Sequence, residues 1–273
     1  MKRILILAAA TLAAHHSFAQ RVTAEFEDGT TMEYEILSSS PDNLAPITLS
    51  FGSTQGNVRD GMKVDYFNED LGIFQLRLPS LLTLVDNSVS PSLRASGLFF
   101  LNSSSKTTMK PITLMSTQSG DVVTKYRTET PIDRKSRFGV HGGLGYRDTR
   151  YSPFGTDELV TYAELMAGVG MFRSQHISIM REVNGAAYRA QGTASMQLTA
   201  DAVLFLGTER ADATDASPIE SESLGFEVAW VGRSSFWGKR DWGIWLTAGY
   251  GVGPVGSYPV LGGGLFFGYG NKL

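Results

Sequence analysis

Two residues that can take part in nucleophilic catalysis stand close together in the second half of the chain. They are His176 and Ser178, and Glu182 follows four residues after the serine. Residues two apart on a β-strand share a face, so the imidazole can lie beside the hydroxyl. A carboxylate that orients the imidazole would complete the arrangement in which a histidine activates a serine. A pair this short also arises often by chance, and we predict that it is not catalytic.

Metal or cofactor chemistry finds little support in the residue patterns. Four acidic residues gather in one polar stretch, but their spacing matches no calcium-binding loop; they are Asp212, Asp215, Glu220 and Glu222. The glycine-rich stretches 249–256 and 262–270 lack the Lys-Ser/Thr ending of a phosphate-binding loop. We therefore predict a solvated acidic loop, glycines that serve curved strands, and neither a metal nor a cofactor.

A third set of titratable residues lies on one face of alternating segments, opposite rows of apolar side chains. The set is His141, Glu164, Asp201, Glu227 and Asp241. If these segments close into a ring of strands, the set lines the lumen. In a narrow ring the side chains would pair with Arg or Lys and fill the interior, whereas in a wider ring they would line a polar, cation-selective channel. We favour the packed interior. Cations near these acids in the sequence are Arg137, Arg147, Arg181, Arg233 and Lys239.

The elements that carry this set are long β-strands. Apolar or glycine residues alternate with polar or small ones in six runs, most of 9–13 residues: 138–146, 159–171, 194–206, 224–230, 242–250 and 261–269. Strands of soluble proteins hold about 5–6 residues, whereas a tilted strand that crosses a bilayer needs about 9–11. Short links at 234–239 and 252–257 and longer polar links at 147–157 and 209–221 separate the runs. The pattern predicts six or seven barrel strands in 137–273.

The first half of the chain alternates less clearly. Segments 22–26 and 30–36 flank Asp28-Gly29, which predicts a hairpin with a two-residue turn. A break with Pro41 follows, so we divide the mature chain into a hairpin and break at 20–43 and a barrel at 44–273. Segment 79–85 is a candidate short helix or plug. Further strands are predicted at 47–51, 62–67, 71–78, 97–101, 108–115 and 122–128.

The start of the chain is typical of an exported protein. Lys2 and Arg3 precede an apolar run, and Ser17-Phe18-Ala19 is a small-x-small site, so residues 1–19 are a predicted signal peptide. Its removal would change the formal charge from −3 to −5. The chain has no cysteine, which excludes disulfides and thiolate chemistry. A mildly acidic chain without a Lys/Arg cluster also argues against nucleic-acid binding.

Together, the signal peptide, the two-sided strands of 137–270 and the glycine- and aromatic-rich end 261–269 resemble the bacterial outer-membrane β-barrel superfamily. The resemblance implies an all-β antiparallel transmembrane barrel, here of about 10–12 strands, in the outer membrane of a Gram-negative bacterium. Its expected partners are outer-membrane lipids, the barrel-assembly machinery and an unidentified envelope protein. Last strands of such barrels usually end in an aromatic residue, whereas Tyr269 lies four residues before the end of this chain.

Three functional classes follow from these patterns. The expected class is a channel, a binding barrel or a structural envelope component, without catalysis. The first alternative is a lipid-modifying hydrolase, because His176-Ile177-Ser178 is similar to the His-x-Ser element of outer-membrane lipid A deacylases. The polar residues that usually follow that element are replaced by Ile179, Met180 and Arg181. The second alternative is a secreted β-sandwich that binds carbohydrate or protein.

Overall fold

The computed structural model describes residues 20–55, 60–79, 92–119, 121–151, 158–183, 186–211, 224–236, 242–253 and 256–269. The predicted signal peptide, residues 80–85 of the candidate helix or plug, and the acidic segment 212–222 lie outside these ranges. Among the described residues, no helix is long and apolar enough to cross a membrane.

Twelve antiparallel strands form one sheet. In chain order they are β1 (Gln20–Glu25), β2 (Thr31–Ser38), β3 (Ile47–Gln55), β4 (Asp60–Asn68), β5 (Gly72–Pro79), β6 (Ser92–Ser119), β7 (Val122–Tyr151), β8 (Glu158–Val183), β9 (Ala186–Ala211), β10 (Leu224–Ser235), β11 (Trp242–Gly253) and β12 (Gly256–Tyr269). The predicted fold class, all-β and antiparallel with about 10–12 strands, is confirmed at this level. The six strands predicted for 137–273 correspond to part of β7 and to β8–β12.

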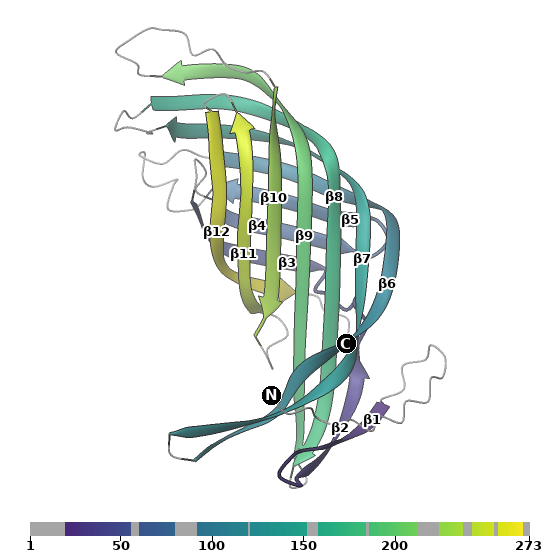
Figure 1. Ribbon diagram of the computed structural model, residues 1–273. Helices are drawn as coiled ribbons and strands as arrows, with labels where there is room; N and C mark the ends of the chain where they lie inside the picture. The colour runs from purple at the N-terminus through teal and green to yellow at the C-terminus, as the bar shows by residue number, and fades with distance from the viewer. Residues whose placement is uncertain are drawn as a thin grey trace.

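Ten of these strands, β3 to β12, close into a ring (Figure 1). Each strand pairs with the next along the chain, and β12 closes the ring on β3 from Leu261 opposite Gln55 to Tyr269 opposite Ile47. Glycines allow close approach between some of these strands. A Cβ atom on Gly139 would lie 1.8 Å from the carbonyl oxygen of Phe99, so no other residue fits there without a backbone shift.

Four strands continue far beyond the ring. β6, β7, β8 and β9 hold 26–30 residues each, more than twice what a bilayer crossing needs. The segments predicted at 97–101 and 108–115 are parts of the single strand β6, and those at 122–128 and 138–146 are parts of β7. The sequence does not predict that these strands are continuous. Between the predicted segments the alternation of apolar and polar residues is lost over a few positions, and such a loss resembles the end of a strand.

The long strands leave the ring as two leaves (Figure 1). β7 pairs with β8 only as far as Arg134 opposite Gln175, and beyond that point β2 takes the place of β7 beside β8. One leaf is then β1-β2-β8-β9, and the other is the hairpin of β6 and β7. We call residues 20–38, 103–133 and 176–193 the extension, and the described parts of β3–β12 outside it the ring.

The predicted hairpin at the start of the extension is present, but its turn is longer than predicted. β1 and β2 pair from Gln20 opposite Ile36 to Glu25 opposite Thr31. The amide of Phe26 donates to the carbonyl of Thr30 at 2.9 Å, which leaves three residues in the loop instead of two. Gly29 has a φ of 78°, a left-handed conformation that glycine adopts without steric cost.

The two leaves of the extension enclose an apolar core. Its buried members come from β1, β2, β6, β7 and β8: Ala24, Tyr34, Ile36, Ile112, Ile132, Ile177 and Ile179. The Tyr34 hydroxyl lies 3.0 Å from the hydroxyl of Thr130 across this core. In the ring, large apolar side chains are exposed on the outside, and the interior holds buried charged and polar side chains together with two apolar clusters.

Candidate functional site

The interior of the ring centres on Arg94 of β6. Its Nε donates to Glu164 Oε1 of β8 at 2.6 Å. Its two terminal nitrogens donate to the carboxylate of Glu227 on β10, at 2.7 and 3.1 Å. All three side chains are buried. Arg94 therefore ties together three strands across the lumen, with the paired geometry that makes guanidinium–carboxylate contacts strong.

A second buried pair joins β7 to β9. His141 Nδ1 lies 2.8 and 2.9 Å from the two carboxylate oxygens of Asp201, so Nδ1 carries the proton and donates it. Asp201 stands directly opposite Glu227 in the pairing of β9 with β10. Like charges in this position repel each other, and the hydrogen bond from His141 to Asp201 and the pairing of Arg94 with Glu227 offset that repulsion.

The lumen has a basic wall and an acidic wall at this level. Lys63, Arg77 and Arg94 are paired positions on the neighbouring strands β4, β5 and β6. Glu164, Asp201 and Glu227 stand on β8, β9 and β10. Gln75 also donates to Gln197 across the interior at 2.9 Å. The remaining cavity among these side chains is about 10 Å³, the space of one water molecule at most, so the lumen is closed here.

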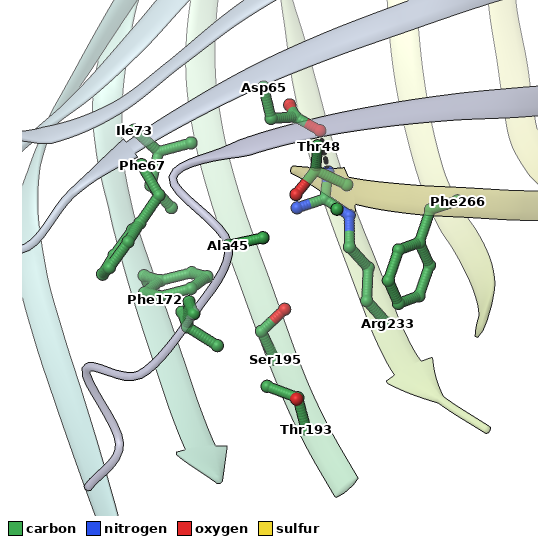
Figure 2. A pocket seen from close by; sticks show the side chains of 12 residues that line it. Ala45, Thr48, Asp65, Phe67, Ile73, Phe172, Thr193, Ser195, Arg233 and Phe266 are labelled. Carbon is green, nitrogen blue, oxygen red and sulfur yellow. Dashed lines mark hydrogen bonds and ion pairs between the residues drawn. The ribbon is translucent and has the colours of Figure 1, made fainter. Parts of the chain in front are cut away.

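A larger cavity lies below this level, toward the extension (Figure 2). It holds about 50 Å³, room for a few water molecules, and its lining includes Leu44, Phe172 and Phe266. On its polar side, Asp65 is bonded to Arg233 and lies 3.5 Å from Lys63. These side chains come from both walls of the ring, and they meet where the linker 39–46 between β2 and β3 passes the lumen.

The linker 39–46 is held by charged contacts. Asp42 accepts from Lys135 at 2.8 Å and also pairs with Arg137. The Arg137 guanidinium is buried, with its carbon 5.3–6.0 Å from the ring centroids of Phe67, Phe100 and Phe172. An arginine among three aromatic rings is favoured by cation–π attraction. This end of the lumen is therefore narrowed by protein contacts as well.

The candidate catalytic residues stand beside this linker. His176 is buried, and its ring nitrogens lie 3.2 Å from Asn43 and 3.4 Å from Thr193. Ser178 is fully buried, and its hydroxyl accepts from Arg189 Nε at 3.1 Å. Glu182 is exposed near the end of β8. A substrate has no access to a hydroxyl with no exposed surface, so these contacts serve to hold the linker and strands together.

Of the five residues predicted to line the lumen, the structure brings four together: His141, Glu164, Asp201 and Glu227. Asp241 lies outside the described residues, as does Lys239. The cation that pairs with Glu164 and Glu227 is Arg94, which was not among the five predicted cations. Arg137 and Arg233 instead bond Asp42 and Asp65 nearer the extension. The signal for Arg94 was present, because Leu93, Ala95, Gly97 and Phe99 alternate around it.

Within the described ranges, no group of three or more histidine and acidic side chains is placed to hold a metal ion. Comparisons with protein-family models, curated proteins and solved structures find no match for this chain. Function must therefore be inferred from the arrangement of its own residues.

Proposed function

We propose that this chain is an outer-membrane β-barrel of a Gram-negative bacterium, a structural component of the envelope whose closed ring anchors the extension beside the membrane. The proposal depends mainly on one face of β8. Leu165 and Val169 are about half exposed in the ring, whereas Ile177 and Ile179 on the same face are buried in the extension. The apolar face is covered by protein only where the strand has left the ring.

The bare apolar surface continues around the ring. Its members come from neighbouring strands and include Phe99, Phe138, Leu144, Leu198, Leu204, Phe226, Val228, Ile244, Leu246, Leu265 and Phe267. In the extension, Met109, Val123 and Tyr188 are the only large apolar side chains among the described residues that are similarly exposed. Soluble proteins rarely expose so large a continuous apolar area, and acyl chains would cover it without cost.

The pairing of the strands also distinguishes a ring suited to lipid from an extension suited to water. A closed ring leaves no unpaired strand edge, which a lipid environment requires. In the extension, one edge of β1 and one edge of residues 103–119 of β6 have no partner strand within the described part of the chain. Open edges of this kind are tolerated in water, where water molecules satisfy the free amides and carbonyls.

The connections favour a periplasmic position for the extension. The longest separations in the sequence between consecutive strands of the ring are twelve residues, between β5 and β6 and between β9 and β10, whose facing ends lie at the end of the ring away from the extension. At the end nearer the extension, β4 and β5 are three residues apart. Outer-membrane barrels place short turns in the periplasm and long loops outside the cell. The predicted signal peptide is consistent with that location. The ion pairs that fill the lumen favour a structural role over that of a channel.

The proposal can be tested with two matched substitutions. Leu246 in the ring and Val123 in the extension are both apolar and exposed to 53% and 51%. An arginine at the bilayer midplane of a barrel costs about 2–4 kcal/mol. We therefore expect Leu246→Arg to reduce assembly in membranes, measured by heat-modifiable migration on gels, and Val123→Arg to leave it unchanged. Equal effects of the two substitutions would contradict a membrane position for the ring.

A further inference from the structure

The two hairpins of the extension differ in charge. Residues 20–38, the β1–β2 hairpin, carry one basic and five acidic residues. Residues 103–133 of β6 and β7 carry four basic and three acidic residues. One of these three acids, Asp133, already accepts hydrogen bonds from Thr107 and Ser39. We call the first the acidic hairpin and the second the basic hairpin.

Several of these charges are exposed and have no ion-pair partner among the described residues. On the acidic hairpin they are Glu25, Glu27 and Glu33. On the basic hairpin they are Lys106, Lys125 and Arg127, together with the acids Asp121 and Glu129. Arg21 is different, because it bonds Glu35 at 3.2 Å within the acidic hairpin. The exposed charges are therefore available to a partner of opposite sign.

Both hairpins also offer free backbone groups. Within the described part of the chain, β1 pairs only with β2, and residues 103–117 of β6 pair only with β7. Figure 1 shows the tip of the basic hairpin projecting to one side of the extension, with the start of β1 on the other side. A free strand edge can accept another strand through main-chain hydrogen bonds.

From these observations we propose that copies of this chain associate side by side, with the acidic hairpin of one copy against the basic hairpin of the next. Within one copy the two hairpins already touch, because Tyr126 donates to Asp28 at 3.0 Å. Glu25 and Glu33 alternate with the buried Ala24 and Tyr34, and Lys125 and Arg127 alternate with the row that holds the buried Thr130. These charges therefore point away from the shared core, and each copy carries the two halves of the contact on opposite faces of its extension. The inference rests on the proposed function, because rings anchored in one membrane hold neighbouring extensions at the same distance from its surface. Contacts of this head-to-tail kind build rows or rings instead of closed pairs.

Other partners fit less well. A contact between two acidic or two basic hairpins would place like charges together. A basic protein from elsewhere could bind the acidic hairpin, but it would leave the basic hairpin unused. An anionic lipid surface could attract the basic hairpin, but it would leave the acidic hairpin unused. A second copy satisfies both surfaces with one contact.

The test uses charge-swapped variants of the full chain, each with two different affinity tags. The first variant is Glu25→Lys/Glu27→Lys/Glu33→Lys, and the second is Lys106→Glu/Lys125→Glu/Arg127→Glu. Copies are reconstituted in vesicles of neutral phospholipid, solubilised in mild detergent and purified through one tag, and recovery of the other tag is measured. Heat-modifiable migration of each variant shows separately whether the ring has assembled in the membrane.

We expect wild-type copies to purify together, and each variant alone to show about tenfold less co-purification, since several exposed ion pairs are lost. A mixture of the two variants should restore co-purification, because a hairpin of one variant then meets a hairpin of opposite charge on the other. Asp70→Lys, an exposed change at a ring turn, should have no effect. Assembled wild-type copies that do not co-purify, or variants that associate like wild type, would overturn the inference. Failure of assembly itself would count against the membrane anchor instead.

Discussion

At the scale of single residues, Arg94 contributes most to closing the lumen. It bonds Glu164 and Glu227, two carboxylates that are buried inside the ring. Removing one partner of a buried ion pair costs about 3–5 kcal/mol, because the charge left behind is neither solvated nor paired. An exposed pair such as Arg21–Glu35 contributes about 0–1 kcal/mol.

We predict that Arg94→Met lowers the free energy of unfolding by about 3–5 kcal/mol. Arg21→Met should lower it by less than about 1 kcal/mol. Urea unfolding in detergent, followed by tryptophan fluorescence, measures both variants. The triple variant Arg94→Met/Glu164→Gln/Glu227→Gln should regain part of the loss, because the two carboxylates that Arg94 bonds are neutralised together with it. A loss for Arg94→Met as small as that for Arg21→Met would show that the network does not hold the ring.

A second prediction at this scale concerns pH and the exposed pair Asp28 and Tyr126 of the extension. The backbone amide of Thr30 holds the pKa of Asp28 below its ordinary value, and the Tyr126 hydroxyl, which donates to Asp28 at 3.0 Å, adds to the effect. The same hydrogen bond raises the pKa of Tyr126 above 10.0. A lowered carboxyl pKa gives stability that is lost as pH falls through it, and a raised tyrosine pKa gives stability that is lost as pH rises through it. The pair should therefore persist from about pH 5 to 9.

Asp28→Asn should lower the pKa of Tyr126 toward its ordinary value, because the carboxylate no longer holds the phenol proton. An alkaline titration of the Tyr126 ring carbon signal by NMR measures this shift. Asp121→Asn, at the tip of the basic hairpin, is the control and should leave the titration unchanged. An identical midpoint in wild type and Asp28→Asn would mean that the hydrogen bond is not formed in solution.

At the scale of elements, β7 contains two glycines that should respond differently to substitution. A Cβ atom on Gly139 would lie 1.8 Å from a backbone oxygen, whereas a Cβ atom on Gly142 would meet only the carbonyl oxygen of Met166, at 3.4 Å. We predict that Gly139→Ala lowers the yield of assembled protein and that Gly142→Ala does not. Heat-modifiable migration measures the yield, and equal tolerance of both changes would contradict the pairing of β6 with β7.

Alternation in the sequence predicted the strands of the ring better than their ends. The rows that place His141, Glu164, Asp201 and Glu227 on one face were visible, because side chains of a strand point alternately to its two sides. The same period continues from Leu165 to Ile179 on β8, although lipid is proposed to cover the first and protein covers the second. Alternation reports which face is apolar and not what covers it, so the extension could not be predicted.

The interior pairs were harder to predict than the strands, because their partners come from distant parts of the chain. Arg94 lies 70 residues from Glu164 and 133 from Glu227. The cations nearest to these acids in the sequence are other residues, whereas ring closure brings β6 to face β8 and β10. For the same reason, the spacing of His176 and Ser178 could not show that Asn43, Thr193 and Arg189 hold them.

At the scale of the whole molecule, the ring and the extension have opposite arrangements of polar and apolar residues. Ion pairs and apolar clusters fill the interior of the ring, and a cavity of only about 10 Å³ remains beside Arg94. We therefore predict that purified wild-type protein shows no conductance in planar bilayers. Glu164→Gln/Asp201→Asn/Glu227→Gln removes three negative charges from the lumen, including the two carboxylates that Arg94 bonds. If that variant conducts, the predicted preference is for anions. Stable, cation-selective conductance in the wild type would contradict the closed lumen and favour the acid-lined channel.

The most direct test of the membrane anchor uses the absence of cysteine from the chain. Single cysteines are placed at Leu165 and Leu246 of the ring and at Glu33 and Lys125 of the extension, all of them half-exposed or more exposed positions. The variants are reconstituted in vesicles, which are opened to give access to both sides, and treated with a membrane-impermeant maleimide. We predict that cysteines at 33 and 125 react fully, and that those at 165 and 246 react only after urea and detergent unfold the chain. Rapid labelling of all four positions in intact bilayers would show that water, and not lipid, surrounds the ring.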